Sequence, residues 1–372
     1  MEMILLEDCC DILDSMRIPV TAENRKKGEY PYYGANGIQD YVADYIFDDE
    51  LVLLAEDGGN FGSKERPIAY RVSGKCWVNN HAHVLKPKEG LDVNYLCYSL
   101  MFYKVDGMVN GATRQKLTQA AMRKMLIPKR TMEEQMNIVD KLNRTIEIKK
   151  KRQIELDELE NLIKSRFVEM FGDPEFNPYK WQQVHLEDVC TSIVRGPFGS
   201  VLKKEFFIPP SETTYKVYEQ KHAIQKSATI GTYYITEEKY NELKRFECFP
   251  GDILMSCSGT MGEFYRLPAD CERGIINQAL CKFTLDEDKI LPVVFLVYMQ
   301  QTIGKLETKG SGIKNIAAVS YVKALPINLP PMSMQENFAA FVQSVDKLKS
   351  EIQKSLDETQ TLMDSLMQKY FG

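Results

Sequence analysis

The chain has 372 residues, of which 44% are hydrophobic, so it is long enough for two or three domains with packed cores. The longest apolar stretch, Leu291 to Met299, contains a proline and is much shorter than the roughly 20 residues of a membrane-spanning helix, so we expect no membrane association. The net charge of −5 provides no general basic surface, and nine scattered cysteines without a C-x-x-C pair indicate reduced thiols in a cytoplasmic protein.

The first 126 residues contain short runs of Tyr, Phe, Val and Ile that glycine, proline and asparagine interrupt, which is typical of strands and turns. The segment GEYPYYGANG, from Gly28 to Gly37, predicts a turn, and Glu50 to Gly62 predicts a strand followed by a glycine-rich turn leading into a second strand. A helix is expected over Val93 to Tyr103. Together these elements predict a mixed α/β domain of ordinary size.

Two groups in this domain have side chains that could bind a metal ion. His81 and His83 would lie on one face of a strand, but no third ligand is near them in the sequence. An acidic group could support metal-assisted cleavage, although a solvated turn is the simpler interpretation; it comprises Asp48, Asp49, Glu50, Glu56 and Asp57. Neither pattern is specific enough to predict a metal site.

A long helix is expected to follow. Residues 131 to 170 contain neither glycine nor proline and are rich in strong helix formers. The entry LIPKRT (Leu126 to Thr131) carries a proline, and Gly172 supplies a glycine stop. Hydrophobic residues at seven-residue spacing favour pairing of this helix with another long helix. Polar residues at Lys149, Gln153 and Glu160 interrupt that row, so the helix should not be stable alone.

Residues 173 to 326 again predict a strand-rich domain. Gly251 to Leu267 has the same pattern of strand, glycine-rich turn and strand, and a helix is expected over Leu291 to Lys305. A second proline-bearing entry, LPINLPP (Leu325 to Pro331), then introduces a second long helix from 333 to 370.

The sequence contains an internal repeat. Residues 127–172 align without a gap on residues 327–372, with 13 identities in 46 positions at an offset of 200. In addition, LEDCC at Leu6 to Cys10 resembles LEDVC at Leu186 to Cys190. We therefore expect an α+β protein in which two strand-rich domains (1–126 and 173–326) are separated by two spacer helices (127–172 and 327–372). The helices should pair as an intramolecular antiparallel coiled coil with pseudo-twofold symmetry; helices that only mediate homodimerisation are the alternative.

Basic and amide or aromatic residues coincide in four loops, where they could contact phosphates and base edges. Ordinary solvated loops are the alternative interpretation of each loop taken singly. Arg114 and Gln115 correspond to Lys314 and Asn315 at the offset of 200. The candidate DNA-binding residues are Arg25, Lys26, Lys27, Tyr30, Tyr32, Tyr33, Asn36, Arg114, Gln115, Lys116, Arg195, Ser200, Lys203, Lys204, Lys309, Lys314 and Asn315.

No nucleotide-binding, methyl-donor or nuclease motif is recognisable, so we predict no cofactor, no metal and no catalytic residue. Two other functions would be compatible with the pattern. One is a self-contained DNA methyltransferase or nuclease with an unrecognised site, which would be active as a purified chain. The other is a protein scaffold built on the helices, which would not discriminate between DNA sequences.

The sequence resembles the DNA specificity subunit of type I restriction-modification systems. The resemblance rests on GEYPYYGANGIQDYVADYIF, VLLAEDGGNF, RGPFGSVLK, the helix entries IPKRTMEEQ and INLPPMSMQ, and the terminal FG. The first entry departs from the usual run of prolines at Lys129, Arg130 and Thr131.

The resemblance implies two target recognition domains, each of which binds one half of a split site in double-stranded DNA. It further implies that the helices dock two methyltransferase subunits, that restriction subunits join the full complex, and that the chain itself is not catalytic.

Overall fold

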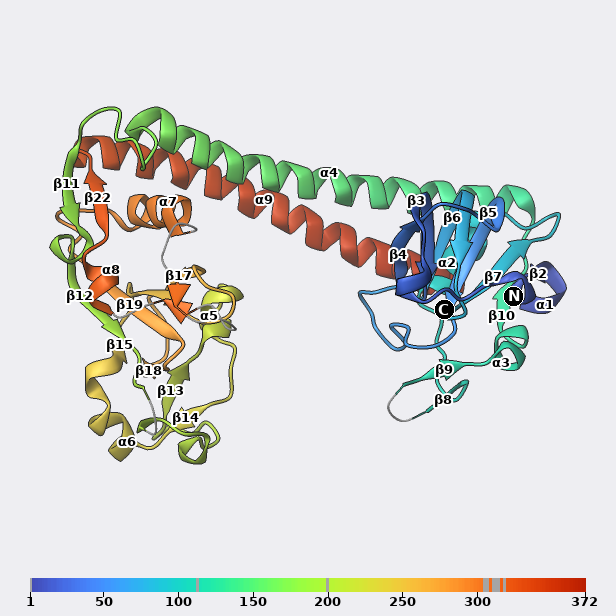
Figure 1. Ribbon diagram of the computed structural model, residues 1–372, viewed down its shortest axis with the longest axis horizontal. Coiled ribbons are helices and arrows are strands. Elements are labelled where there is room, and N and C mark those ends of the chain that lie inside the picture. Colours follow the sequence, from blue (N-terminus) through green and yellow to red (C-terminus); the bar gives the residue numbers. More distant parts are fainter. Residues whose placement is uncertain (1, 112–113, 199–200, 304–307, 310–314, 317–318) are drawn as a thin grey trace. The chain divides into compact units, whose positions relative to one another are not determined.

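The structure is a computed structural model of residues 1–372, and it describes the whole chain except residues 1, 112–113, 199–200, 304–307, 310–314 and 317–318. The chain forms two compact units. Unit 1 comprises Met1–Ile154 and Ile352–Gly372, and unit 2 comprises Glu155–Glu351. Each unit holds one strand-rich domain, called here head 1 or head 2, and part of two long helices, α4 (Met132–Phe171) and α9 (Met332–Phe371) (Figure 1). The expected fold class, mixed strand-rich domains with a long helix pair, is confirmed.

Both long helices begin where the proline-bearing entries predict. Thr131 caps α4, because its hydroxyl accepts a hydrogen bond from the Glu134 amide while the Glu134 carboxylate accepts one from the Thr131 amide. Gly172 ends α4 with a φ of +80°, a conformation that favours glycine. α9 follows Pro331, whose carbonyl accepts the first helical hydrogen bond from Met334.

In unit 1 the first half of α4 packs against the last part of α9. Ile138, Val139 and Leu142 form a buried cluster with Tyr95 and Tyr98 of the head. Five α9 residues pack against this cluster, namely Met363, Leu366, Met367, Tyr370 and Phe371. The start of one helix therefore meets the end of the other.

In unit 2 the end of α4 meets the start of α9, so the two helices run antiparallel. Phe338 is fully buried, and its ring centroid lies 5.6 Å from that of Phe167 and 5.4 Å from that of Phe171. Polar residues that interrupt the hydrophobic row between the two helices also have partners. Lys349 forms an ion pair with Glu160 in unit 2. In unit 1 Lys149 Nζ donates to Gln360 Oε1 at 2.5 Å.

Head 1 is built on a six-stranded sheet of order β2-β7-β5-β6-β3-β4, in which only the β3–β6 pair is parallel. The central strand β5 is buried on both faces. Val52 and Leu54 pack with Leu96 of helix α2, while Leu51 and Leu53 belong to a separate cluster. The elements of head 1 are β1 (Met3–Leu5), α1 (Leu6–Cys9), β2 (Cys10–Ile12), β3 (Lys27–Gly34), β4 (Gly37–Val42), β5 (Phe47–Ala55), β6 (Ala69–Val78), β7 (Ala82–Pro87), α2 (Val93–Met101), β8 (Val109–Asn110), β9 (Lys116–Leu117), α3 (Gln119–Arg123) and β10 (Leu126–Pro128).

Eight strands of head 2 form two four-stranded sheets, of order β12-β19-β16-β17 and β14-β13-β18-β15. The β13–β18 pair is parallel, as β3–β6 is in head 1. The elements of head 2 are β11 (Gln182–His185), η3 (Leu186–Asp188), β12 (Cys190–Arg195), β13 (Tyr215–Tyr218), α5 (Gln220–Ile224), β14 (Tyr234–Ile235), α6 (Glu237–Glu242), β15 (Glu247–Cys248), β16 (Ile253–Ser256), β17 (Phe264–Arg266), β18 (Gly274–Ile276), β19 (Leu280–Leu285), α7 (Pro292–Thr302), β20 (Thr308–Lys309), β21 (Asn315–Ile316), α8 (Val319–Lys323) and β22 (Pro326–Leu329).

The repeated segments join each head to its helix in the same way. β1 pairs with β10, and β11 pairs with β22, so each LED segment follows a strand that lies beside the helix entry. The identical glutamines of the repeat are buried just inside each helix. Gln135 accepts a hydrogen bond from the Asp92 amide and donates to the carbonyls of Gly90 and Arg130.

Gln335 makes the corresponding three hydrogen bonds in unit 2. It accepts from the Leu291 amide and donates to the carbonyls of Lys289 and Pro330. Each glutamine therefore clamps the segment before a head helix to the first turn of a long helix. Among the residues that the structure describes, no helix is both long enough and apolar enough to cross a membrane.

Candidate nucleic-acid interface

Four chain segments of head 1, three loops and the strand β9, are joined by backbone hydrogen bonds. The β3–β4 hairpin turns at Ala35 and Asn36, where Gly37 takes a φ of +110°. The loop after β5, the turn between β6 and β7, and the strand β9 are joined to it by backbone hydrogen bonds. Asn79 donates to the Tyr33 carbonyl (3.0 Å), Glu56 to His81 (2.8 Å), and Leu117 to Glu56 (2.7 Å). The four segments thus form a connected frame.

Predicted residues from distant parts of the sequence come together on this frame. Asn36 Nδ2 donates to the Gly58 carbonyl at 3.0 Å, and the Gly58 amide donates to the Gln115 carbonyl at 3.2 Å. Arg114 and Lys116 form ion pairs with Asp57 and Glu56 at 2.7 and 3.0 Å. Asn36, Arg114, Gln115 and Lys116 are all exposed, so they form one polar surface that is available to a ligand.

Residues from the GEYPYYGANG segment take different positions. Tyr32 is only 1% exposed, and its hydroxyl bonds to the backbone of Val20, so it braces the hairpin and does not lie on the surface. The Arg25 guanidinium lies 4.2 Å from the Tyr32 ring and pairs with Asp40 at 3.3 Å. Both residues therefore help to hold the hairpin, and their contact with DNA stays a prediction.

The other candidates in this segment remain at least partly accessible. The ring of Tyr30 packs edge-on against Tyr45 at 5.2 Å, and that of Tyr33 lies 5.8 Å from Tyr70; both residues are half-buried. Lys26 and Lys27 are exposed.

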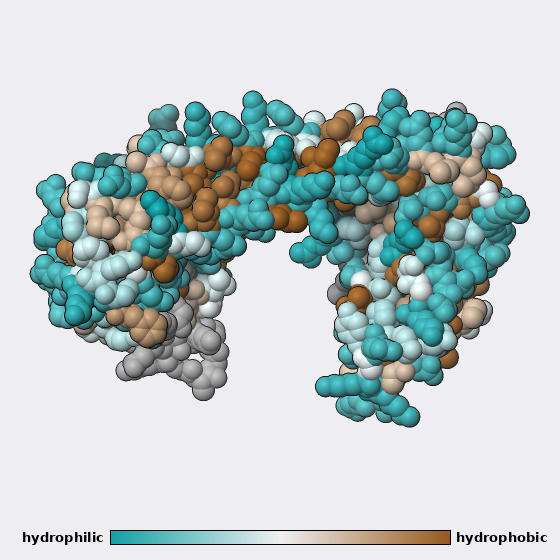
Figure 2. Space-filling model, turned by 90° about the horizontal axis from the view of Figure 1, so that it is seen from above, coloured by the Kyte–Doolittle hydropathy of each residue, from teal (hydrophilic) through white to brown (hydrophobic). Residues whose placement is uncertain are grey.

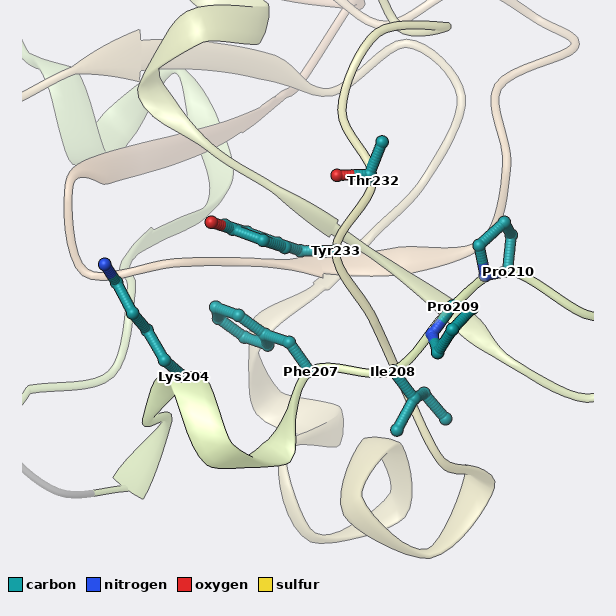
Figure 3. A pocket seen from close by; sticks show the side chains of 7 residues that line it. All are labelled: Lys204, Phe207, Ile208, Pro209, Pro210, Thr232 and Tyr233. Atoms are coloured by element: carbon teal, nitrogen blue, oxygen red, sulfur yellow. The ribbon is translucent and has the colours of Figure 1, made fainter.

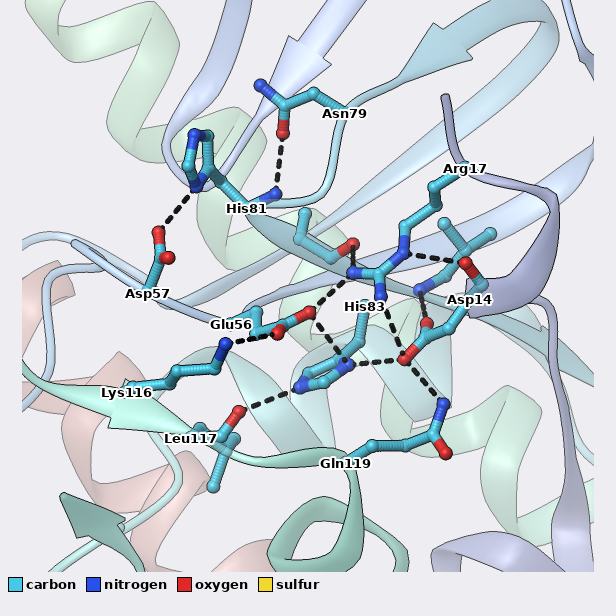
Figure 4. Close-up of polar contacts among 12 residues, drawn as sticks. Asp14, Arg17, Glu56, Asp57, Asn79, His81, His83, Lys116, Leu117 and Gln119 are labelled. Carbon is cyan, nitrogen blue, oxygen red and sulfur yellow. Dashed lines mark hydrogen bonds and ion pairs between the residues drawn. The ribbon is translucent and has the colours of Figure 1, made fainter. Parts of the chain in front are cut away.

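A second polar group adjoins this surface through Glu56, which pairs with Lys116 (Figure 4). His83 is fully buried, with Nδ1 2.7 Å from Asp14 Oδ2 and Nε2 2.9 Å from the Leu117 carbonyl. Oxygen and nitrogen atoms of Asp14, Glu56 and His83 lie within 4.8 Å of one another, which is close enough for metal ligands. However, Arg17 already pairs with Glu56 at 2.6 Å and with Asp14 at 3.4 Å.

This group therefore fits a salt-bridge network better than a metal site. Burial raises the pKa of Asp14, but hydrogen bonds from His83, the Val84 amide and Gln119 outweigh it, so the carboxyl pKa lies below its usual value. At Glu56, burial likewise raises the carboxyl pKa, but hydrogen bonds from Arg17 and Lys116 lower it by more. The pKa of Glu56 therefore also lies below its usual value. Positive charge from the protein thus already compensates both carboxylates.

The two candidate metal-binding patterns of the sequence do not each come together as one group of ligands. His81 bonds to Asp57 and His83 to Asp14, so the two imidazoles have different partners. The acidic group is also divided, because Asp48, Asp49 and Glu50 lie at the start of β5 and Glu56 and Asp57 follow its end. Asp49 pairs with Lys86 and Glu50 with Arg71, as expected of solvated strand residues.

Sequence reasoning missed the contact between His81 and Asp57. The Nδ1 atom of His81 lies 2.6 Å from Asp57 Oδ1, the same oxygen that accepts from Arg114 Nη2 at 2.7 Å. Asn79 Oδ1 accepts from the His81 amide at 2.8 Å, so both the backbone and the ring of His81 are fixed (Figure 4). Asp57 and His81 lie far apart in sequence, so no local motif announces the pair.

Head 2 repeats the backbone frame with other side chains. Asn277 donates to the Tyr218 carbonyl at 2.9 Å, as Asn79 does to Tyr33. Cys257 donates to the Ala279 carbonyl at 2.7 Å, as Glu56 does to His81. By this register Ala279 replaces His81, and the strand pairs Ala55–Ala82 and Ser256–Leu280 give the same correspondence.

The glycine-rich loops of the two frames also correspond. Gly58 and Gly259 both have a φ of +62°, which places Ser258 at the position of Asp57. Gln220 donates to the carbonyls of Ser258 and Thr260, much as Asn36 holds Gly58 in head 1. Aligning Asn79 with Asn277 would have been the sequence signal for this correspondence.

The remaining candidates lie in unit 2. Arg195 ends β12 and is buried, with its guanidinium 5.1 Å from the Phe198 ring. Lys203 pairs with Glu205 at 3.5 Å. Lys204 lines a cavity of about 390 Å³ beside the stacked rings of Phe207 and Tyr233 (Figure 3). The backbones of Lys309 and Asn315 pair across β20–β21, while Ser200 and Lys314 lie outside the described residues.

Comparison with known proteins identifies the class to which this two-headed chain belongs. Residues 1–158 and 178–359 match the family model of the type I restriction modification DNA specificity domain. The chain belongs to this family. Both heads and most of both long helices lie within the matched residues, so the family of DNA specificity subunits accounts for the duplicated architecture.

Individual relatives agree with this assignment. A Haemophilus influenzae protein named as a type I restriction enzyme specificity subunit is 28% identical over 365 residues, which cover 94% of this chain and 89% of the relative. Among solved structures, the type I restriction-modification S subunit from M. genitalium covers 100% of this chain and 96% of its own, with 14% identity and a TM-score of 0.54.

A second solved structure, from work on complex assembly and conformational transition of the type I restriction-modification system, is 16% identical with a TM-score of 0.59. It covers 100% of this chain and 97% of its own. These two likenesses are likenesses of fold, and each extends over the full length of this chain.

Proposed function

We propose that the chain recognises a bipartite, asymmetric site in double-stranded DNA, with one half-site read by each head. The observation that carries this proposal is the pair of matching frames. The same backbone network holds His81 and Asp57 in head 1 but Ala279 and Ser258 in head 2. A shared frame with different side chains is suited to presenting different hydrogen-bonding groups to two different base sequences.

The exposed basic residues of head 1 would supply phosphate contacts. Arg114 and Lys116 are 60% and 49% exposed at their side chains, although each is paired with a carboxylate. On binding, DNA phosphates would replace these carboxylates as the partners of Arg114 and Lys116. This replacement limits the net gain in binding free energy, and the phosphate contacts make the affinity depend on salt concentration. The net charge of −5 agrees with modest affinity of the isolated chain.

We also propose that the chain directs methyltransferase and restriction subunits to the site and is not itself catalytic. Figure 2 shows apolar side chains at the surface of the helical part of the molecule. In unit 1, Ile148 and Ile154 of α4 are 48% and 47% exposed; in unit 2, Leu162 and Leu348 are 47% and 50% exposed. Exposed apolar residues of this kind support a surface that a partner protein covers.

Two measurements test the proposal. The first is sequencing of DNA methylated in cells with and without the gene, which should yield one asymmetric motif of two parts separated by a fixed spacer. The second is a gel shift with a duplex that carries this motif and with a duplex in which both halves are scrambled. Equal binding of the two duplexes would contradict sequence recognition, and methylation by the purified single chain would contradict the non-catalytic assignment.

A further inference from the structure

The imidazole of His81 is held with one nitrogen directed away from its protein partner. Nδ1 lies 2.6 Å from Asp57 Oδ1, and Nε2 is on the side of the ring that points away from Asp57 (Figure 4). The side chain is 33% exposed, whereas that of Asp57 is 18% exposed. Within the described part of the chain, no hydrogen bond occupies Nε2. His81 therefore offers one accessible hydrogen-bonding atom in a fixed direction.

The partner of Nδ1 determines what Nε2 can do. An ionised carboxylate only accepts hydrogen bonds, so Asp57 requires the proton of a neutral imidazole to be on Nδ1. Nε2 then carries a lone pair and accepts a hydrogen bond. In the major groove the donors at base edges are the exocyclic amino groups, N6 of adenine and N4 of cytosine.

Asp57 also couples His81 to a basic residue. Its Oδ1 accepts from Arg114 Nη2 at 2.7 Å, and Arg114 Nη2 lies 3.4 Å from His81 Nδ1. Arg114 is 60% exposed and can therefore contact a phosphate beside the base that His81 contacts. One carboxylate thus orients two neighbouring groups of different chemistry.

The frame itself does not depend on this arrangement. Head 2 keeps the asparagine and the backbone hydrogen bonds but has Ala279 and Ser258 where head 1 has His81 and Asp57. A histidine that only supported the loops would have to be replaced by another supporting side chain in head 2. The alanine shows that a methyl group is sufficient at this position.

We propose that His81 is a specificity-determining residue that accepts a hydrogen bond from an exocyclic amino group of adenine or cytosine in the first half-site. Asp57 is the positioning residue that keeps the Nε2 lone pair exposed. The inference rests on the proposed DNA-recognition function and adds to it the residue and the chemical group involved.

The test uses the full chain assembled with its methyltransferase partner and a duplex that carries the motif found by methylome sequencing. In a series of duplexes, single adenines of the first half-site are replaced by purine, which lacks N6, and single cytosines by pyrimidin-2-one, which lacks N4. The wild-type complex should lose roughly three- to tenfold in affinity at one of these positions, the range of one net hydrogen bond. A loss with purine identifies an adenine as the base that His81 contacts, and a loss with pyrimidin-2-one identifies a cytosine.

The His81→Ala variant should bind the unmodified duplex about as weakly as the wild type binds the sensitive analogue, and it should be indifferent to that analogue. Asp57→Asn should lose the same sensitivity, because an amide can present its NH₂ group and stabilise the other tautomer. Arg114→Ala should instead weaken binding to all duplexes and keep the sensitivity. The control is His185→Ala, which removes an exposed histidine 3.8 Å from Asp188 in unit 2 and should change neither quantity.

The proposal is overturned if His81→Ala keeps the full analogue sensitivity of the wild type, or if it lowers binding to motif and scrambled duplexes equally. Failure of the proposed function looks different, because the wild type would then not distinguish the motif from scrambled DNA. A grafted pair, Ala279→His with Ser258→Asp, gives an independent measurement. It should add sensitivity to one amino-group deletion in the second half-site and leave the first half-site unchanged.

Discussion

Replacing Gln135 by alanine should loosen the junction between head 1 and α4. Gln135 is 2% exposed and makes three hydrogen bonds, at 2.8 Å from the Asp92 amide and at 2.9 and 3.0 Å to the carbonyls of Gly90 and Arg130. The substitution leaves these backbone groups without a partner. A buried unpaired group costs about 1–3 kcal/mol, and water can reach some of the three once the side chain is gone.

We therefore expect Gln135→Ala to lower the free energy of unfolding of unit 1 by about 2–4 kcal/mol. For a unit of this size, each kcal/mol corresponds to a shift of about 2–4 °C in the unfolding temperature. Hydrogen exchange should accelerate in the segment around Asp92, where the amide loses its acceptor. Gln335→Ala should have the same effect in unit 2, around Leu291, because its three hydrogen bonds are 2.9, 3.0 and 2.9 Å long.

The control is Gln343→Ala, which removes an exposed glutamine from α9. It should change the unfolding temperature by less than about 2 °C, since surface substitutions are usually within 0.5 kcal/mol. The reasoning is refuted if Gln135→Ala behaves like Gln343→Ala, or if the exchange of both heads accelerates equally when one glutamine is replaced.

Three further predictions concern the helices and the pH response. Inserting or deleting matched lengths in both long helices, within Leu142 to Ile163 of α4 and the paired part of α9, should change the spacer of the methylated motif and leave both half-sites intact; a methylome with altered half-sites would contradict this. Phe338→Ala should destabilise unit 2 by about 3–5 kcal/mol in denaturant unfolding, because Phe338 is fully buried among aromatic rings; a change below about 1 kcal/mol would be inconsistent with that packing. Burial lowers the pKa of His222 below 6.5, and its Nδ1 accepts from the Glu219 amide, so the folded state holds it neutral. Holding His222 neutral costs no stability above about pH 6.5, and stability is lost as the pH falls below that value, because the unfolded chain then binds a proton that the folded chain does not. His222→Gln should therefore flatten the decline in stability of unit 2 as the pH falls below about 6.5.

The sequence predicts the helices and the joints well because their signals are local. Thr131 with Glu134 and Gly172 fix the ends of α4 through contacts within one helical turn. The seven-residue rows predict the pairing because Leu142, Ile163, Val342 and Leu356 need only face a common seam, and all four are buried. The repeat then predicts that Gln135 and Gln335 occupy equivalent positions, although not what they bind.

The interior of the heads could not be predicted in the same way. A six-stranded sheet in head 1 and two four-stranded sheets in head 2 differ in strand pairings between residues far apart in sequence, and strand patterns do not specify those partners. For the same reason the sequence leaves open which tyrosine of GEYPYYGANG faces outward and which braces the hairpin, since that depends on packing; Tyr32 is the one that is buried. The Asp57–His81 pair depends on the meeting of two loops and was likewise not predictable.

The division of α9 between the units has a consequence for the order in which the protein can be assembled during synthesis. Ile352–Gly372 belongs to unit 1 but leaves the ribosome after the whole of unit 2. Until then, Ile138 and Leu142 of α4 lack the methionine and leucine side chains that later cover them, and Tyr95 lacks the ring of Phe371 that packs 5.3 Å from it. While head 2 is being translated, these apolar side chains of unit 1 are therefore exposed and can bind chaperones or other nascent chains.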